Sequence, residues 1–215
     1  KHHVPAKAGT AGAAKALDPI KAKRQGKTFE HPIGFKFWHP ADWKVQEFEG
    51  GLRLIPADES TSPQGPNELY VIIGDQVVDP NINRVDHPLV IQYLDQKVRG
   101  TVPFLTREGQ PQVILTPRGK GLVMNWKGTN QQGKTVNARA YAALIKNWGV
   151  ALIGMGLEDL MKKREGEMKA MFETFGFGAA KTDPNLAGDW RCEKYYSSSD
   201  QKFSSNTIIN MRLAR

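Results

Sequence analysis

Apolar and polar residues alternate along most of the chain between residues 28 and 156, a pattern typical of strands with one buried face. The first strand is expected to contain Phe29, Ile33, Phe35 and Phe37. Segments that contain glycine at 50–51, 117–121, 128–133 and 147–149 are expected to form turns. Further strands are expected at 43–48, 52–55, 69–74, 112–116, 121–126, 134–145 and 150–156.

Two segments instead repeat apolar residues at helical spacing. In the first, Asp86 is the expected N-cap, Pro88 falls in the first turn and Gly100 ends the helix. Its expected buried face contains Leu89, Val90, Tyr93, Leu94 and Val98. The second helix is expected over residues 157–175, closed by Gly176. Two helices beside these strands, with mostly short connections, predict an α+β fold around an antiparallel sheet meander.

Composition divides the chain into three parts. Residues 1–27 are rich in Ala, Gly and Lys and are interpreted as a flexible basic arm or linker. Residues 28–178 contain the predicted strands and helices and are expected to form one domain, and residues 179–215 are expected to form a linker and a β-hairpin. Because two strands cannot bury a core alone, this hairpin joins the sheet, pairs with another chain, or opens an incomplete second β domain.

Charge is concentrated in the first part. Residues 1–27 contain seven basic residues and one acidic residue, and so carry +6 of the formal net charge of +8. No aromatic residue precedes Phe29, whereas a nucleic-acid interface combines a basic folded face with stacking aromatics. We therefore expect no nucleic-acid partner. The arm is interpreted as solvated, the alternative being weak contact with an acidic or membrane surface.

The chain begins at Lys1 without an initiator methionine, which fits a cleaved signal or lipoprotein leader. An extracytoplasmic location, periplasmic or secreted, is therefore expected for the mature form. No apolar run approaches the roughly 20 residues that span a bilayer.

His31 and His39 are the candidate metal ligands, in a stretch that also holds Trp38 and Trp43. A zinc or copper site needs a third or fourth ligand at a defined spacing, and none is evident. Both histidines precede proline, which removes a backbone donor and limits strand pairing, so we interpret them as parts of the fold. His2 and His3 on the arm form too weak a ligand set to indicate a metal site. We therefore expect no metal and no cofactor.

Candidate catalytic residues are equally sparse. Cys192 is the single cysteine, and Arg191 beside it would favour the thiolate, but no histidine follows it and no G-x-S-x-G motif occurs. The segment 117–121, PRGKG, offers glycines and two cations but lacks both Walker spacing and a following helix, so a hairpin turn is preferred. The acidic residues of the last helix are assigned to the helix dipole and to solubility: Glu158, Asp159, Glu165 and Glu167. No catalytic residue is predicted.

The block from Thr28 to Gly178 resembles the PsbP-like family, relatives of the extrinsic photosystem II protein that share their fold with a Ran-binding nuclear import factor. The resemblance rests on GFKFWHPADWKV at 34–45, GGLRLIP at 50–56, the meander through 123–156, and the final helix ending in FETFGF at 172–177. It implies an antiparallel sheet sandwiched by helices and an accessory role without catalytic residues. Family members that handle manganese or calcium use acids and histidines that have no match here, so no site residue is carried over.

Gly188-Asp189-Trp190 is similar to the G-x-W that opens lipocalin-like barrels. If that likeness holds, the barrel lacks most of its strands and the sequence is a fragment of a longer protein.

Three functions remain open from the sequence. The first is a non-catalytic accessory or scaffold protein that docks on a larger protein assembly through the sheet edge, the loops or the terminal segments. The second is a carrier of a small hydrophobic ligand that uses a C-terminal lipocalin-like barrel. The third is a hydrolase that uses Cys192. We expect the first, and therefore no enzyme.

Overall fold

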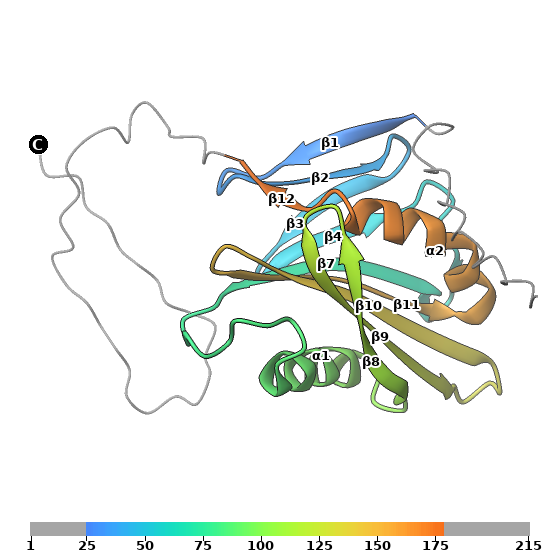
Figure 1. Ribbon diagram of the computed structural model, residues 1–215. Helices are drawn as coiled ribbons and strands as arrows, with labels where there is room; N and C mark the ends of the chain where they lie inside the picture. The colour runs from blue at the N-terminus through green and yellow to red at the C-terminus, as the bar shows by residue number, and fades with distance from the viewer. Residues whose placement is uncertain (1–24, 179–215) are drawn as a thin grey trace, which may run out of the picture.

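The computed structural model describes residues 25–178, which form a seven-stranded sheet, a three-stranded sheet, a short two-stranded sheet and two helices (Figure 1). The expected C-terminal hairpin, Cys192, the G-x-W motif and residues 1–24 of the arm lie outside the described residues. The elements in chain order are β1 (Gly26–Glu30), β2 (Phe35–Pro40), β3 (Lys44–Phe48), β4 (Gly51–Ile55), β5 (Thr61–Ser62), β6 (Gly65–Pro66), β7 (Glu68–Gln76), α1 (Pro88–Thr101), β8 (Thr106–Thr116), β9 (Gly119–Thr129), β10 (Thr135–Ile145), β11 (Trp148–Leu157), α2 (Glu158–Phe172) and β12 (Gly176–Phe177).

The main sheet has seven strands in the order β3-β4-β7-β11-β10-β9-β8, and every neighbouring pair is antiparallel. This confirms the predicted α+β class. The sheet consists of two meanders, joined where β11 pairs with β7, with Val150 opposite Gly74. The connection through α1 carries the chain from β7, in the interior of the sheet, to β8 at its edge.

A second sheet, β2 flanked by β1 and β12, was not predicted. The alternation from Phe29 to Phe37 belongs to a hairpin, in which these two residues lie opposite each other, and not to one strand. Gly34 has a φ of 88°, which allows the turn between β1 and β2. Ile33 lies in this turn and is exposed, so the apolar pattern continued across a change of direction.

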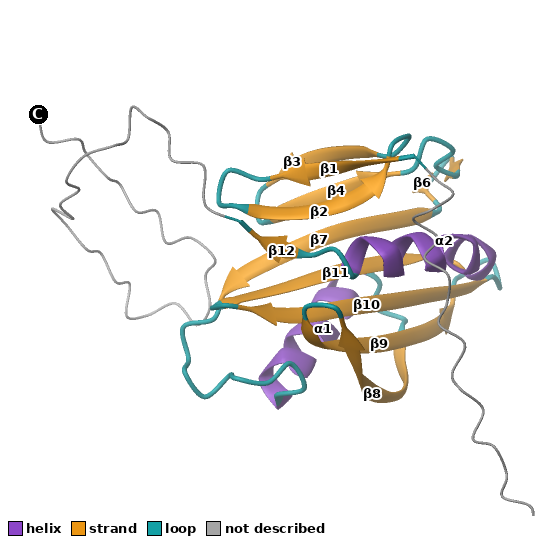
Figure 2. Ribbon diagram, turned by 45° about the horizontal axis from the view of Figure 1, so that its top comes forward, coloured by secondary structure: helices purple, strands orange, loops and turns teal. Residues whose placement is uncertain are grey.

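Two hydrophobic cores lie on the two faces of the main sheet. The helices α1 and α2 lie on opposite faces of this sheet (Figure 2). The first core lies between the main sheet, α2 and the three-stranded sheet, and the second lies between the main sheet and α1. Successive strand residues point to opposite faces, so Tyr141 and Leu152 enter the first core while Ala142 and Ile153 enter the second. The sandwich of sheet and helices implied by the resemblance is therefore present.

Helix boundaries differ from expectation by a few residues. His87, and not Asp86, is the N-cap of α1, because its Nδ1 accepts a hydrogen bond from the backbone N–H of Leu89. Only Leu94 and Val98 of the expected α1 face are buried. Helix α2 ends at Phe172, and Gly176 belongs to β12. Within residues 25–178, neither helix is long and apolar enough to cross a membrane.

The turn between β10 and β11 lies earlier in the chain than the expected residues 147–149. It consists of Lys146 and Asn147, while Trp148 and Gly149 already belong to β11. Lys146 has a φ of 58°, a conformation that non-glycine residues seldom adopt, so a turn was expected at the following glycine and not at this lysine.

Candidate functional site

A groove opens at one end of the first core, between the three-stranded sheet and the β3–β4 side of the main sheet, with a cavity volume of about 320 Å³. We call it the end groove. Ile33, Phe35 and Phe177 line it from the three-stranded sheet and its turn. From the main sheet it is lined by Phe48 and Trp148, among others. Elements far apart in sequence, including both hairpin turns near residues 33 and 50, meet here.

Glycines keep the groove open. Gly51 begins β4, where a Cβ atom would lie 2.3 Å from the carbonyl oxygen of Ile72, so only glycine permits this approach of β4 to β7. Gly74 of β7 also lines the groove, but a Cβ atom there would meet only ordinary contacts, the nearest at 3.8 Å from the carbonyl oxygen of Gly149. The missing side chain of Gly74 therefore leaves space that a larger residue could fill without strain.

The rim of the groove exposes large apolar side chains. Ile33 and Phe48 keep 45% and 47% of their surface accessible. Behind them, the rings of Trp148 and Phe177 stack with centroids 5.9 Å apart. Each exposed apolar side chain would be stabilised by roughly 25 cal/mol per Å² if a partner covered it, and a contiguous apolar patch rimmed by polar groups is typical of an interaction site.

Two polar side chains contribute to the described lining, His31 and Glu47. Nδ1 of His31 accepts a hydrogen bond from the backbone N–H of Ile33 at 3.3 Å. A neutral imidazole that accepts through Nδ1 carries its proton on Nε2, which is then a donor. The groove thus combines apolar walls with one donor and one carboxylate.

The two candidate metal ligands have separate places. His31 lies in the groove, whereas His39 is buried in β2 with its Nδ1 2.8 Å from the carbonyl oxygen of Pro40. Burial lowers the pKa of His39, and repulsion from Lys27 adds to this, although the contact with Pro40 acts in the opposite sense. Within residues 25–178, no group of three or more His, Cys, Asp or Glu side chains could hold a metal ion.

The segment 117–121 contains the turn of the β8–β9 hairpin, as expected, with Gly119 at a φ of 125°. The backbone N–H of Arg118 donates to Oγ1 of Thr116 at 3.2 Å. This local bond closes the turn, and no helix follows it.

The acidic residues of α2 do not all serve the role assigned to them. Glu158 lies in the first turn and pairs with Lys162 at 3.2 Å, in keeping with a dipole role, and Glu165 pairs with Arg139. Glu167 is buried, with Oε2 3.7 Å from Nη1 of Arg164. The assignment of Glu167 to solubility was therefore wrong.

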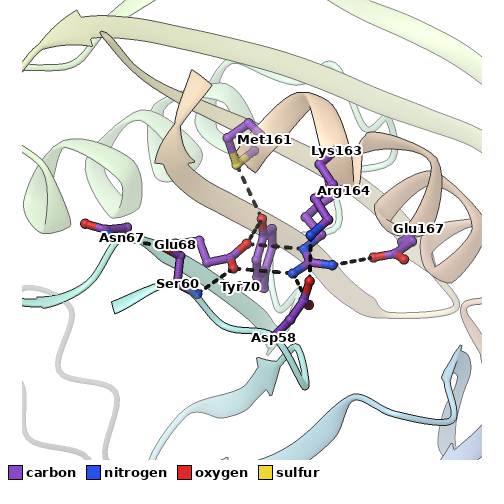
Figure 3. A network of polar contacts seen from close by, with 9 residues as sticks. All are labelled: Asp58, Ser60, Asn67, Glu68, Tyr70, Met161, Lys163, Arg164 and Glu167. Carbon is purple, nitrogen blue, oxygen red and sulfur yellow. Dashed lines mark hydrogen bonds and ion pairs between the residues drawn. The ribbon is translucent and has the colours of Figure 1, made fainter. Parts of the chain in front are cut away.

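Arg164 is the centre of a buried polar network that the sequence analysis missed (Figure 3). Its side chain is 2% exposed, and its Nε donates to Oε2 of Glu68 at 3.3 Å. The same carboxylate accepts from the hydroxyl of Tyr70 at 2.9 Å and from the backbone N–H of Ser60 at 3.1 Å. The guanidinium carbon lies 5.5 Å from the centroid of the Trp43 ring.

Asp58 closes the network from the solvent side. Its carboxylate accepts from Nη2 of Arg164 and from Nζ of Lys163, both at 2.5 Å. Hydrogen bonds from Lys163 and then Arg164 hold the pKa of Asp58 well below its usual range. Burial, followed by the neighbouring Glu68, raises the pKa of Tyr70, so this hydroxyl stays protonated. These bonds fasten the loop that contains Asp58 and Ser60 to α2, which is a structural role.

One signal in the sequence could have revealed Arg164. It lies three residues after Met161 and four before Met168, both of which are buried, so its position is on the apolar stripe of α2. A charged residue at such a position is buried only when it is paired.

Comparisons with known proteins bear on the fold. No family model and no curated protein matches the chain. The solution structure of cyanobacterial PsbP (CyanoP) from Synechocystis sp. PCC 6803 is similar with a TM-score of 0.51 and 8% identity, over 79% of this chain and 100% of that one. The crystal structure of LpqN, involved in cell envelope biogenesis of Mycobacterium tuberculosis, has a TM-score of 0.49 and 14% identity, over 77% of this chain and 98% of that one. The similarity to CyanoP shows that this chain has a PsbP-like fold.

Proposed function

We propose that this chain is a non-catalytic accessory protein that docks on a larger protein assembly, and that the end groove is its docking site. One observation carries the proposal: Ile33 and Phe48 are exposed on the rim of an apolar groove built from both sheets. The accessory role implied by the PsbP-like resemblance agrees with it. The described lining contains no Ser, Thr, Cys, Lys or Tyr side chain, so it lacks the hydroxyl, thiol and amine nucleophiles that covalent catalysis most often uses.

The chemistry of the groove indicates what the partner presents. Its apolar walls suit an apolar side chain as an anchor, because buried anchors in pockets supply most of the free energy of protein association. Glu47 at the groove suits a basic residue beside that anchor, which would add to specificity and to the association rate. The expected partner segment therefore combines an apolar side chain with a neighbouring Lys or Arg.

The first test fills the groove. In Gly74→Leu the new side chain occupies the groove, and in the matched control Gly100→Leu the same side chain is added to α1, where no atom lies within 4 Å of the new Cβ. The tagged full chain is purified gently from its native cells, and co-purifying proteins are identified by mass spectrometry. We expect the control to retain co-purifying partner proteins that Gly74→Leu loses. Equal retention by both variants contradicts the proposal.

The second test addresses the chemistry of the partner. Two synthetic peptides share a central Leu-Phe pair and differ only in flanking Lys or Glu residues, and their binding is followed by fluorescence anisotropy. The Lys peptide is expected to bind about tenfold more tightly, and Glu47→Gln should remove most of the difference. Equal binding of both peptides to the unmodified chain contradicts the assigned role of Glu47.

Three further expectations stay predictions. The extracytoplasmic location is tested by fractionation of native cells. Contact of the basic arm with an acidic or membrane surface, and strand pairing by residues 179–215, concern segments outside the described residues.

A further inference from the structure

Strand β8 forms one edge of the main sheet, on the opposite side from β3 (Figure 2). In the part of the chain that the structure describes, its one sheet neighbour is β9. An edge strand presents a row of backbone donors and acceptors that another strand can pair with. This edge is separate from the end groove, because β8 contributes no residue to the groove lining.

The two halves of β8 differ in how they are protected. The first half contains a register shift between Glu108 and Gln112, with Gly109 at a φ of 70°. This half also carries the charged residues Arg107 and Glu108. Bulges and charges in an edge strand discourage pairing with a further strand. The second half, residues 112–116, carries no charge, and its Leu115 is 86% exposed. Val113, on the same face of the strand, is exposed as well.

The sequence around this second half is nearly symmetric. It is PQVILTP, residues 111–117, with a proline at each end and Ile114 at the centre. Around Ile114, Val113 is matched by Leu115, and Gln112 by Thr116. Two antiparallel copies centred on Ile114 therefore place apolar residues opposite apolar residues and polar opposite polar. Such self-complementarity is what a two-fold interface requires.

We propose that β8 pairs with β8 of a second copy of this chain, antiparallel and centred on Ile114, so that two main sheets become continuous across a two-fold axis. Val113 of each copy then lies opposite Leu115 of the other, and their exposed surface is buried by cross-strand packing. The prolines at 111 and 117 limit the paired segment, because proline donates no hydrogen bond to a ladder. Arg118 would face Gln110 of the other copy, so the alignment opposes no like charges there.

Sedimentation of the full 215-residue chain over about a hundredfold range of concentration tests this association. We expect a dimer that dissociates on dilution. Leu115→Lys introduces a charge into the pairing segment and should weaken the dimer at least about tenfold. Val78→Lys is the matched control, because Val78 is also 86% exposed but lies outside the sheet, and it should leave the dimer unchanged.

Disulfide trapping tests the alignment. In a Cys192→Ser background, Ile114→Cys lies opposite its own copy on the two-fold axis, within the Cα distance that a disulfide needs. Leu115→Cys lies opposite Val113, and its own copy is displaced diagonally, beyond easy reach. Oxidation should therefore cross-link Ile114→Cys at least about tenfold faster than Leu115→Cys.

The proposal is overturned if the chain is monomeric at every concentration. That result would be expected if β8 paired with a strand of a different protein instead. It is also overturned if Leu115→Lys and Val78→Lys change the dimer equally, or if Leu115→Cys cross-links faster than Ile114→Cys. These outcomes do not depend on the end groove, so they leave the proposed docking function to its own tests.

Discussion

The burial of the Arg164 side chain depends on the charged and aromatic side chains around it. A buried guanidinium is strongly disfavoured unless its charge and its donors are satisfied. Here Glu68, Asp58 and Glu167 supply the opposite charge, and Trp43 covers the guanidinium with its ring. Removing the cation would leave the buried carboxylate of Glu68 without its ion-pair partner.

Arg164→Ala is therefore expected to lower the free energy of unfolding by at least about 3 kcal/mol. Lys163→Ala is the control: Lys163 also pairs with Asp58, but its side chain is 55% exposed, and its loss should cost no more than about 1 kcal/mol. Urea unfolding followed by tryptophan fluorescence measures both. If the two variants were equally stable, the network would not hold the loop to α2 as we describe.

The backbones of β4 and β7 approach closely at Gly51. At Gly51 the two strands approach so closely that the carbonyl oxygen of Ile72 occupies the place of a Cβ atom. A backbone oxygen in a sheet cannot move aside cheaply, unlike the end of a flexible side chain. The same contact forms the wall of the end groove.

We expect Gly51→Ala to lower the free energy of unfolding by about 2 kcal/mol, because one of the paired strands must shift. Gly100→Ala should instead raise the free energy of unfolding. That residue lies near the end of α1 with no atom within 4 Å of the added Cβ, and alanine in place of glycine in a helix contributes about 0.5 to 1 kcal/mol. Thermal and urea unfolding of both variants check the pair, and a loss at both positions would contradict this account.

The two cores share the main sheet, so neither can form fully without it. Helix α2 and the three-stranded sheet cover one face, and α1 covers the other. Because both cores lie within residues 25–178, this range is expected to fold by itself.

A fragment of residues 25–178 should unfold in one cooperative transition, with circular dichroism and tryptophan fluorescence giving the same midpoint. A second fragment, residues 25–157, keeps the main sheet but lacks α2 and β12, so one face of the sheet loses most of its cover. It should show no cooperative transition and should bind an apolar dye such as ANS. A cooperative transition in the shorter fragment would contradict the shared role of α2.

The sequence alone predicted the α+β class, both helices and most strands of the main sheet. Periodicity is a local property that burial on one face imposes on each element, so it can be recognised without the partners. The same local view failed between Phe29 and Phe37, where the apolar pattern runs through a turn, and at Lys146, where a lysine adopts a conformation that its type rarely shows.

Pattern and order also indicated the PsbP-like fold, whereas only the tertiary structure decided where the candidate sites lie. The end groove joins Ile33, Phe48 and Trp148 from three hairpins, and the buried network joins Asp58 to Arg164 across 106 positions. Neither can be derived from spacing, because which segments meet depends on the order of strands in the sheet and on how the two sheets pack. Local sequence determines which face of an element is buried, but the packing of whole elements determines which side chains meet.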